Sequence, residues 1–126
     1  MIAYDTQDTV AGYRMHERLE ERLGNATTAR YQLSVTINQG RRPAAITDDG
    51  DTTRYNLTGT ANWTLTDLNT GDKIDSGKVN GFTSYSATGS TTATQSATTD
   101  ATARLSVMLA DMVVARVLVL APQLAQ

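Results

Sequence analysis

Residues 54–66 read Arg54-Tyr-Asn-Leu-Thr-Gly-Thr-Ala-Asn-Trp-Thr-Leu-Thr66, in which apolar or small residues alternate strictly with polar ones. This alternation predicts a β-strand, because successive side chains of a strand point to opposite faces. One face is apolar and the other polar, as in an antiparallel sheet that is covered on a single side. The apolar face carries Tyr55, Leu57, Gly59, Ala61, Trp63 and Leu65.

The residues that follow predict a hairpin. Residues 67–72 contain Asp, Asn and Gly, which favour a tight turn. The partner strand is expected from about residue 73 to residue 85. Its Ile74 and Val79 differ in parity, so both face inward only if the strand contains a bulge. The glycines of this segment, Gly77 and Gly81, are the candidate positions for that bulge.

Upstream of the hairpin the chain predicts one more alternating strand and a loop. Residues 31–38 alternate apolar and polar side chains and read as a half-buried strand. Residues 39–51 contain two glycines, a proline and three aspartates, and we predict a loop there.

The two ends of the chain predict helices. A short strand is expected at residues 2–6, with Thr6 or Asp8 as the cap of an amphipathic helix that ends at Gly24. A second helix is expected over about 97–120. Residues 86–99 read either as a flexible loop or as the frayed start of that helix. The order strand, helix, three strands, helix predicts an α+β fold with both helices on one sheet face.

The last helix has two apolar stripes. One contains Ala101, Leu105, Met108, Leu109 and Met112, and the other contains Val107, Ala110, Val114 and Val117. A sheet covers only one side of a helix, so the second stripe requires another partner. Either the first helix covers it, or part of it is exposed and binds another protein. The residues expected to form such a partner-binding surface are Val113, Val114, Val117 and Leu118.

Composition excludes several classes of function. The chain has 126 residues, which suits a single domain over 1–126, and a net charge of -2, which argues against a nucleic-acid partner. With His16 as its one histidine and no cysteine, it cannot form a catalytic triad or a two-histidine metal site. We therefore predict no catalytic residues, no metal and no cofactor. The aspartates around Gly50 are read as a solvated turn, because no closing glutamate follows them.

Five basic residues are candidates for binding an anionic ligand. Arginine suits phosphate because its planar guanidinium donates two hydrogen bonds at once. Ordinary surface charge is the competing interpretation. The candidates are Arg41, Arg42, Arg54, Lys73 and Lys78.

Four segments, in order, resemble the lipopolysaccharide-assembly lipoproteins of the LptE family. The segment Met15-His-Glu-Arg-Leu-Glu-Glu-Arg-Leu-Gly24 is similar to their first helix. Thr53-Arg-Tyr-Asn-Leu with Thr64-Leu-Thr-Asp-Leu-Asn-Thr-Gly71 resembles their middle hairpin, and Ser76-Gly-Lys-Val-Asn-Gly-Phe-Thr-Ser-Tyr-Ser-Ala-Thr88 resembles the next strand. Asp100-Ala-Thr-Ala-Arg104 and Leu109-Ala-Asp-Met112 are similar to their last helix.

The resemblance implies two helices on a mostly antiparallel four-stranded sheet. It also implies a non-enzymatic accessory of the outer-membrane β-barrel LptD, active in lipopolysaccharide delivery on the periplasmic side of the outer membrane. The family carries an N-terminal lipidated cysteine, so a lipid anchor would have to lie in a leader outside this chain. Where the family presents basic residues to lipopolysaccharide, this chain has Thr47-Asp48-Asp49 and Thr94-Gln95-Ser96, so those contacts are not transferred.

Two other functions compete with this expectation. An auxiliary lipoprotein of an ABC-type lipid transporter would also be periplasmic and without enzymatic activity. A small-ligand-binding domain, or an enzyme, would need a concave pocket with converging polar groups. The membrane protein recovered in a pull-down distinguishes the barrel accessory from the transporter lipoprotein. The presence or absence of a concave pocket tests the ligand-binding or enzymatic function.

Overall fold

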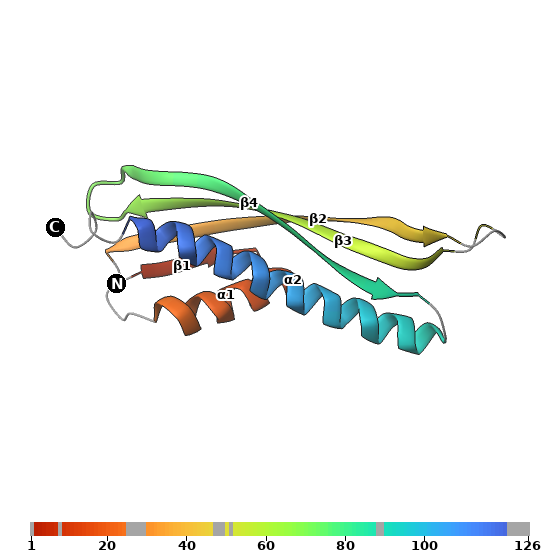
Figure 1. Ribbon diagram of the computed structural model, residues 1–126. Coiled ribbons are helices and arrows are strands. Elements are labelled where there is room, and N and C mark those ends of the chain that lie inside the picture. The colour runs from red at the N-terminus through yellow and green to blue at the C-terminus, as the bar shows by residue number, and fades with distance from the viewer. Residues whose placement is uncertain are drawn as a thin grey trace.

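The computed structural model describes residues 2–7, 9–24, 30–46, 50, 52–87 and 90–120. Both helices lie on the same side of a single four-stranded sheet, as Figure 1 shows, so the predicted two-layer α+β fold is confirmed. The elements in chain order are β1 (Ile2–Thr6), α1 (Val10–Leu23), β2 (Tyr31–Ile46), β3 (Thr52–Asp67), β4 (Lys73–Ser86) and α2 (Thr91–Val119).

The strands lie in the order β1-β2-β3-β4, with β1 parallel to β2 and the remaining pairs antiparallel. The long β2–β3 ladder runs from the Tyr31↔Asp67 pair to the Ile46↔Thr52 pair. Because β1 has only five residues, most of β2 has a neighbour on one side only. The sheet therefore has two open edges, one along β4 and one along the distal part of β2.

The predicted loop over 39–51 is wrong for its first half, because β2 continues to Ile46. Pro43 does not stop the strand. Odd-numbered residues of β2 direct their backbone groups away from β3, as the bond from Ile37 N–H to the Gln7 side chain shows, so a proline removes no ladder bond there. Arg41 and Arg42 consequently lie on a strand. The predicted aspartate turn at Asp48, Asp49 and Asp51 lies outside the described residues.

The predicted bulge is present, but not at either glycine. Leu65 pairs with Asp75 and Thr66 pairs with Lys73, so Ile74 is the extra residue. Gly77 and Gly81 instead provide space. A Cβ at Gly77 would lie 2.9 Å from Trp63 Nε1, and one at Gly81 would lie 2.8 Å from Met108 Sδ of α2.

Hydrogen bonds within the turn confirm the predicted β3–β4 hairpin. Asp67 N–H donates to Asp72 O at 2.9 Å, and Asn69 N–H donates to the Asp67 carboxylate at 2.8 Å. Gly71 adopts a φ of +77°, which glycine tolerates without strain.

The N-terminal cap of α1 is Thr9, whose Oγ1 accepts a bond from Gly12 N–H at 3.0 Å. The predicted caps were Thr6, which is the last residue of β1, and Asp8, which lies outside the described residues. At the other end Gly24 takes a φ of +87° and donates its N–H to Glu20 O, as expected for a glycine that terminates a helix.

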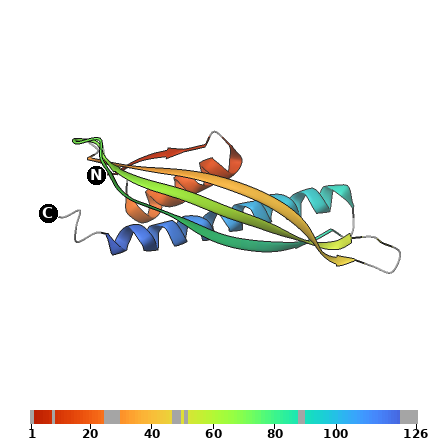
Figure 2. The ribbon, with the colours of Figure 1, turned by 90° about the horizontal axis from the view of Figure 1, so that it is seen from above.

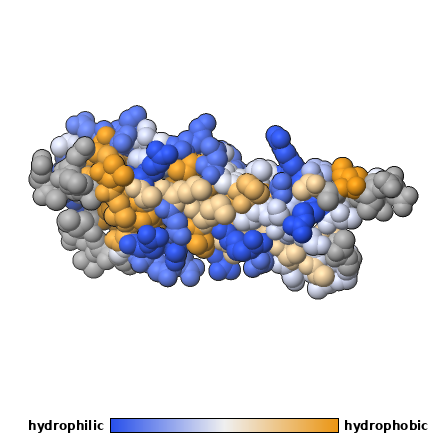
Figure 3. Space-filling view, in the orientation of Figure 1, coloured by the Kyte–Doolittle hydropathy of each residue, from blue (hydrophilic) through white to orange (hydrophobic). Residues whose placement is uncertain are grey.

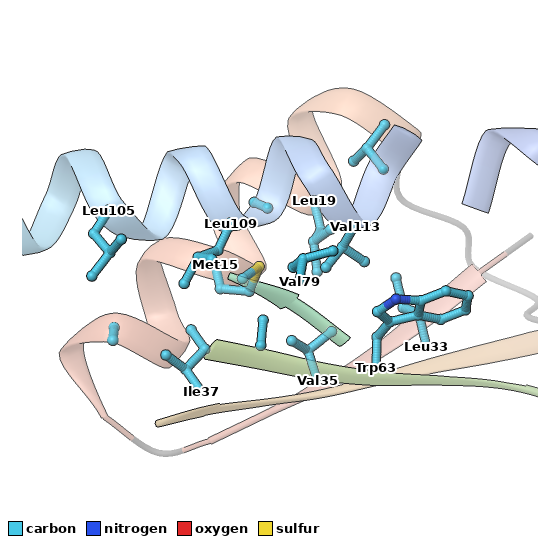
Figure 4. Close-up of a cluster of buried hydrophobic side chains, with 14 of the residues drawn as sticks. Met15, Leu19, Leu33, Val35, Ile37, Trp63, Val79, Leu105, Leu109 and Val113 are labelled. Carbon is cyan, nitrogen blue, oxygen red and sulfur yellow. The ribbon is translucent and has the colours of Figure 1, made fainter. Parts of the chain in front are cut away.

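Helix α2 begins at Thr91, capped by Ser90, so residues 91–99 belong to the helix and the expected start near residue 97 was too late. Its first stripe packs on the sheet: Leu105 and Leu109 are fully buried and point toward the strands in Figure 4, where α2 contacts β3 and β4. Its second stripe is buried beside α1, except that Val107 at the rim is 36% exposed. The interpretation that α1 covers the second stripe is therefore correct for most of it.

Candidate partner-binding surfaces

The five predicted basic residues do not form one site. Arg54 pairs with Ser86 at one end of the β3–β4 ladder, and Lys73 pairs with Thr66 at the other. Twelve residues of β3 separate Arg54 from Thr66, a span of about 40 Å at ~3.3 Å per residue. Arg41 and Arg42 lie near the Arg54 end, because β2 pairs them with Leu57 and Asn56.

Arg41 is held on the helix-covered face of the sheet by two tyrosines. Its guanidinium carbon lies 4.3 Å from the centre of the Tyr55 ring, and its Nη1 donates to Tyr85 Oη at 3.5 Å. The two rings stack with their centres 5.6 Å apart. The hydrogen bond to Tyr85 is the main cause that raises the pKa of Arg41. The result is an exposed cation whose aromatic base restricts its orientation.

Sequence reasoning missed this Arg–Tyr–Tyr cluster because residues 39–46 were read as a loop. The signal that identifies it is parity. Arg41 has the same parity as Leu33 and Val35, and cross-strand partners in a sheet share a face. A strand continued to residue 43 therefore places Arg41 on the face of Tyr55.

The opposite face of the sheet is not covered by any described element, and it is almost entirely polar. We call it the open face. It carries Arg42 and Arg54, and it includes one exposed aromatic side chain of β4, Phe82, at 59%. Side-chain bonds cross it from Thr60 Oγ1 to Asn80 Oδ1 at 2.7 Å. The remaining side chains are Gln32, Ser34, Thr36, Asn38, Asn56, Thr58, Asn62, Thr64, Thr66, Ser76, Lys78 and Ser84.

An ion-pair network fixes the two helices relative to each other. The Asp111 carboxylate of α2 accepts bonds from Arg18 Nε at 2.9 Å and from Arg22 Nη1 at 2.9 Å, both on α1. The hydrogen bond from Arg18 is the largest cause that lowers the pKa of Asp111 below its usual value of 3.8, and the bond from Arg22 lowers it further. The network lies over the apolar contact between the helices, so it has a structural role.

The single histidine also has structural partners. His16 Nε2 lies 2.7 Å from Glu20 Oε1, one helical turn away, and its ring meets the Tyr4 ring edge-on at 5.6 Å. Burial, and then the charge of Glu20, raise the pKa of Tyr4. The Tyr4 hydroxyl donates a hydrogen bond to the carbonyl of Gly24. Within the described ranges, no three histidine, cysteine, aspartate or glutamate residues are arranged to hold a metal ion.

The predicted apolar partner surface on α2 requires correction. Val113, Val114 and Val117 are at most 2% exposed and belong to the core, because the sheet and α1 cover this helix from two sides. Only Leu118 of the predicted four is exposed, at 52%, and Val119 beside it reaches 75%. Figure 3 shows apolar surface gathered toward the end of the molecule where β1 begins and α2 ends. Partner binding at Leu118 stays a prediction.

The hollows found on the described surface are grooves open to solvent. One groove, of about 590 Å³, lies between α1 and the N-terminal half of α2 and has Arg14 and Asp100 as its charged residues. Its other lining residues are Thr92, Gln95, Ser96, Thr99 and Ala103. Acid–base chemistry needs titratable groups that converge on a substrate. This groove does not supply them.

The sequence profile of one family, described as "LptE: Lipopolysaccharide-assembly", matches residues 2–117. The chain belongs to the LptE family. The match covers every helix and strand in full or nearly in full, including the open face and both helices.

Solved structures share this LptE fold at low sequence identity. Rare lipoprotein B from Shewanella oneidensis superposes with a TM-score of 0.75 at 13% identity, over 99% of this chain and 98% of that one. A putative lipoprotein from Caulobacter crescentus superposes with a TM-score of 0.73 at 20% identity, over 89% of this chain and 83% of that one. A minor lipoprotein from Acinetobacter baumannii superposes with a TM-score of 0.67 at 19% identity, over 89% of this chain and 85% of that one. No curated protein sequence matches the chain. Among the described helices of this LptE-family chain, none has the length and apolarity of a membrane span.

Proposed function

We propose that this chain is a non-enzymatic accessory of the outer-membrane barrel LptD and assists the delivery of lipopolysaccharide to the cell surface. Membership of the LptE family supports a role in lipopolysaccharide assembly. The same membership favours the barrel accessory over a lipoprotein of an ABC-type transporter. The proposal includes a lipid anchor on the periplasmic side of the outer membrane, supplied by a leader.

The open face is the observation that carries the partnership. Strands of 16, 16 and 14 residues present one broad polar layer that no described element of the chain covers. Most small domains use such a face as an ordinary solvated surface. Within a lipopolysaccharide-assembly family, a long face rich in hydroxyl and amide groups suits the polar interior of a large outer-membrane barrel. We therefore place the barrel contact on the open face.

Co-purification from solubilised envelopes tests this placement. Thr36→Arg with Asn62→Arg introduces two bulky cations at a central cross-strand pair of the open face, and both side chains are exposed, so folding is retained. The matched control, Gln95→Arg with Ser96→Arg, adds the same charge to the exposed surface of α2. We expect the first variant to lose LptD and the control to retain it.

Two results contradict the proposal at different levels. If the unaltered chain recovers no LptD, the partnership itself is wrong. If both double variants recover LptD equally, the partnership stands and the open face is not the contact. Circular dichroism on each variant excludes unfolding as the cause of a loss.

Direct lipopolysaccharide binding is a separate part of the proposal, and the structure sharpens its test. Arg41 and Arg42 lie on opposite faces of the sheet, so the two residues are reversed one at a time. We expect Arg42→Glu with Arg54→Glu to weaken lipopolysaccharide binding if the open face is used, and Arg41→Glu to do so if the Arg–Tyr–Tyr cluster is used. Lys73→Glu, about 40 Å from Arg54 by strand length, is the control. Unchanged affinity in all three removes these residues from the site.

A further inference from the structure

Strand β4 stands at the end of the strand order, so one of its edges has no strand beside it among the described residues. Figure 2 shows this strand at the border of the sheet, with α2 running next to it. An open edge presents backbone N–H and C=O groups that are able to pair with another extended chain. Which residues present them follows from the ladder.

The hydrogen bonds at both ends of the β3–β4 ladder fix this pattern. Ala87 N–H donates to Thr53 O at 2.9 Å, and Asp67 N–H donates to Asp72 O at 2.9 Å, so odd-numbered residues of β3 face β4. Between the bulge and Ser86 the register is continuous and joins odd residues to odd residues. In an antiparallel ladder alternate residues face away from the neighbour. The even-numbered residues of β4 therefore direct their backbone groups outward.

Local groups already occupy the two ends of this edge. Ser76 N–H donates to the Asp75 carboxylate at 2.8 Å, and Ser84 O accepts a bond from Arg104 Nη2 at 3.2 Å. Both contacts agree with the outward direction of the even residues. Lys78, Asn80 and Phe82 remain between them, and none of the backbone bonds described above uses their N–H or C=O groups. Three such residues match a short added strand.

A groove lies beside the same residues. It has a volume of about 400 Å³ and is open to solvent along β4. Its apolar part is formed by Val79, Met112 and Ala115. Met112 is half-buried, and methionine adapts its shape to different partners. The full lining is Lys78, Val79, Asn80, Met112, Ala115 and Arg116.

The groove is flanked by two cations, Lys78 of β4 and Arg116 of α2. Both are exposed, and neither forms an ion pair with another residue in the described part of the chain. Asp75, three residues before Lys78, already accepts the Ser76 N–H. The Lys78 side chain belongs to the open face of the edge strand and Arg116 lies on α2, so an extended chain along β4 has a cation on each side, which favours a ligand with negative charge.

We propose that the β4 edge and this groove bind an extended acidic peptide segment of a partner protein as an added strand. The peptide backbone pairs with Lys78, Asn80 and Phe82. Side chains on one face of the peptide enter the groove against Val79 and Met112, beside Arg116, and carboxylates on its other face meet Lys78. This mode obtains affinity from main-chain bonds and specificity from alternate side chains. It does not rest on the barrel partnership, because edge, groove and charges belong to this chain alone.

The aligned backbone groups favour a peptide over a lipid. An acyl chain has no donors or acceptors, and a lipid head group contacts the cations without using three successive outward residues. A peptide strand uses both sets of groups at the spacing of a β-sheet. Binding of an anionic lipid is therefore the outcome that overturns the proposal.

The test uses a synthetic peptide of about eight residues that alternates glutamate with valine, titrated into the isotopically labelled chain. We expect amide shift changes and slowed hydrogen exchange centred on Lys78, Asn80 and Phe82. The same peptide with alternate amides methylated should lose binding, because it cannot form the ladder. A version with lysine in place of glutamate should bind at least about tenfold more weakly.

Variants of the chain separate backbone from side-chain effects. Asn80→Pro removes one outward N–H without breaking a bond to β3, whereas Asn80→Ala removes the side chain and keeps that N–H. We expect Asn80→Pro to weaken binding about tenfold and Asn80→Ala to leave it nearly unchanged. Lys78→Glu with Arg116→Glu should weaken it by a similar factor. Lys73→Glu, on the same strand but outside the groove, is the charge control.

Three results overturn the proposal. One is peptide binding that is equal with and without methylated amides, which excludes strand addition. Another is shift changes confined to residues outside β4 and α2. The last is a double charge variant that loses binding to phosphatidylglycerol vesicles but keeps its affinity for the acidic peptide, which assigns the groove to lipid. The barrel co-purification above is scored separately, so either proposal can fail alone.

Discussion

Two glycines that pair across β3 and β4 should respond oppositely to the same substitution. Gly59 and Gly81 face each other under α2. A Cβ at Gly59 would lie 3.0 Å from Leu105 Cδ2 and 3.0 Å from Leu109 Cδ1, and both leucines are fully buried. A Cβ at Gly81 would meet Met108 Sδ at 2.8 Å, and the next atom is 3.6 Å away. Met108 is half-buried and flexible, so it moves aside more easily.

The magnitude follows from two opposing effects. Alanine in place of glycine stabilises a strand by roughly 0.5–1 kcal/mol, because the unfolded chain has less freedom to lose. Overpacking a tight core costs about 1–3 kcal/mol. We expect Gly59→Ala to lose about 1–2 kcal/mol of unfolding free energy and Gly81→Ala to change it from about zero to a gain of about 1 kcal/mol.

Equilibrium urea denaturation measures this difference. With a slope of about 1–3 kcal/mol per molar urea for a small domain, the two midpoints should differ by roughly 1 M. Gly71→Ala does not serve as a control, because its φ of +77° introduces strain. If Gly59→Ala proves as stable as Gly81→Ala, α2 does not rest on β3 through Leu105 and Leu109, and the packing described above is wrong.

Three other predictions test the capping, the core and the helix contact. Gly24→Ala should lower the unfolding free energy by about 1 kcal/mol, because φ is +87° there; an unchanged thermal midpoint would contradict the cap. Trp63→Phe should lower the unfolding free energy by under about 1 kcal/mol, because the buried Nε1 has no hydrogen-bond partner among the described residues. A truncation to alanine should cost far more, ~3–5 kcal/mol. A loss above about 3 kcal/mol for Trp63→Phe in urea denaturation would show a missed hydrogen bond. Asp111→Asn should cost about 1 kcal/mol at neutral pH through Arg18 and Arg22. The pKa of Asp111 is lower in the folded chain, so this contribution is present above the unfolded value near 3.8 and is lost as pH falls through the folded value; a deficit that is constant down to pH 2 would refute the pairing.

The sequence predicted the fold where periodicity was strong. The alternation around Trp63 identified the central strand and its buried face, and the parity conflict of Ile74 with Val79 predicted a real bulge. The sequence prediction ended β2 too early because its distal residues are exposed and make no close contact with α2, so they need no apolar face. Arg41 then continues the pattern as an arginine that stacks on Tyr55.

The surface was harder to predict than the fold. Val113, Val114 and Val117 were expected at an exposed site, but a helix covered on two sides buries both stripes, and sequence spacing alone does not count the covering elements. Likewise, nothing local marks Asp111 as the partner of Arg18, because 93 residues separate them. The groove beside β4 depends on strand order, which follows only from the assembled sheet.

Helix α2 follows all four strands in chain order, which has a consequence for biosynthesis. Chains emerge N-terminus first, and domains complete folding only when all their parts are available. Trp63 of β3 and Val79 of β4 cannot be shielded from water until the 29-residue helix α2 has emerged. A polypeptide that ends before residue 100 would expose the long apolar face of the sheet. Premature termination should therefore yield a species that depends on chaperones or is degraded.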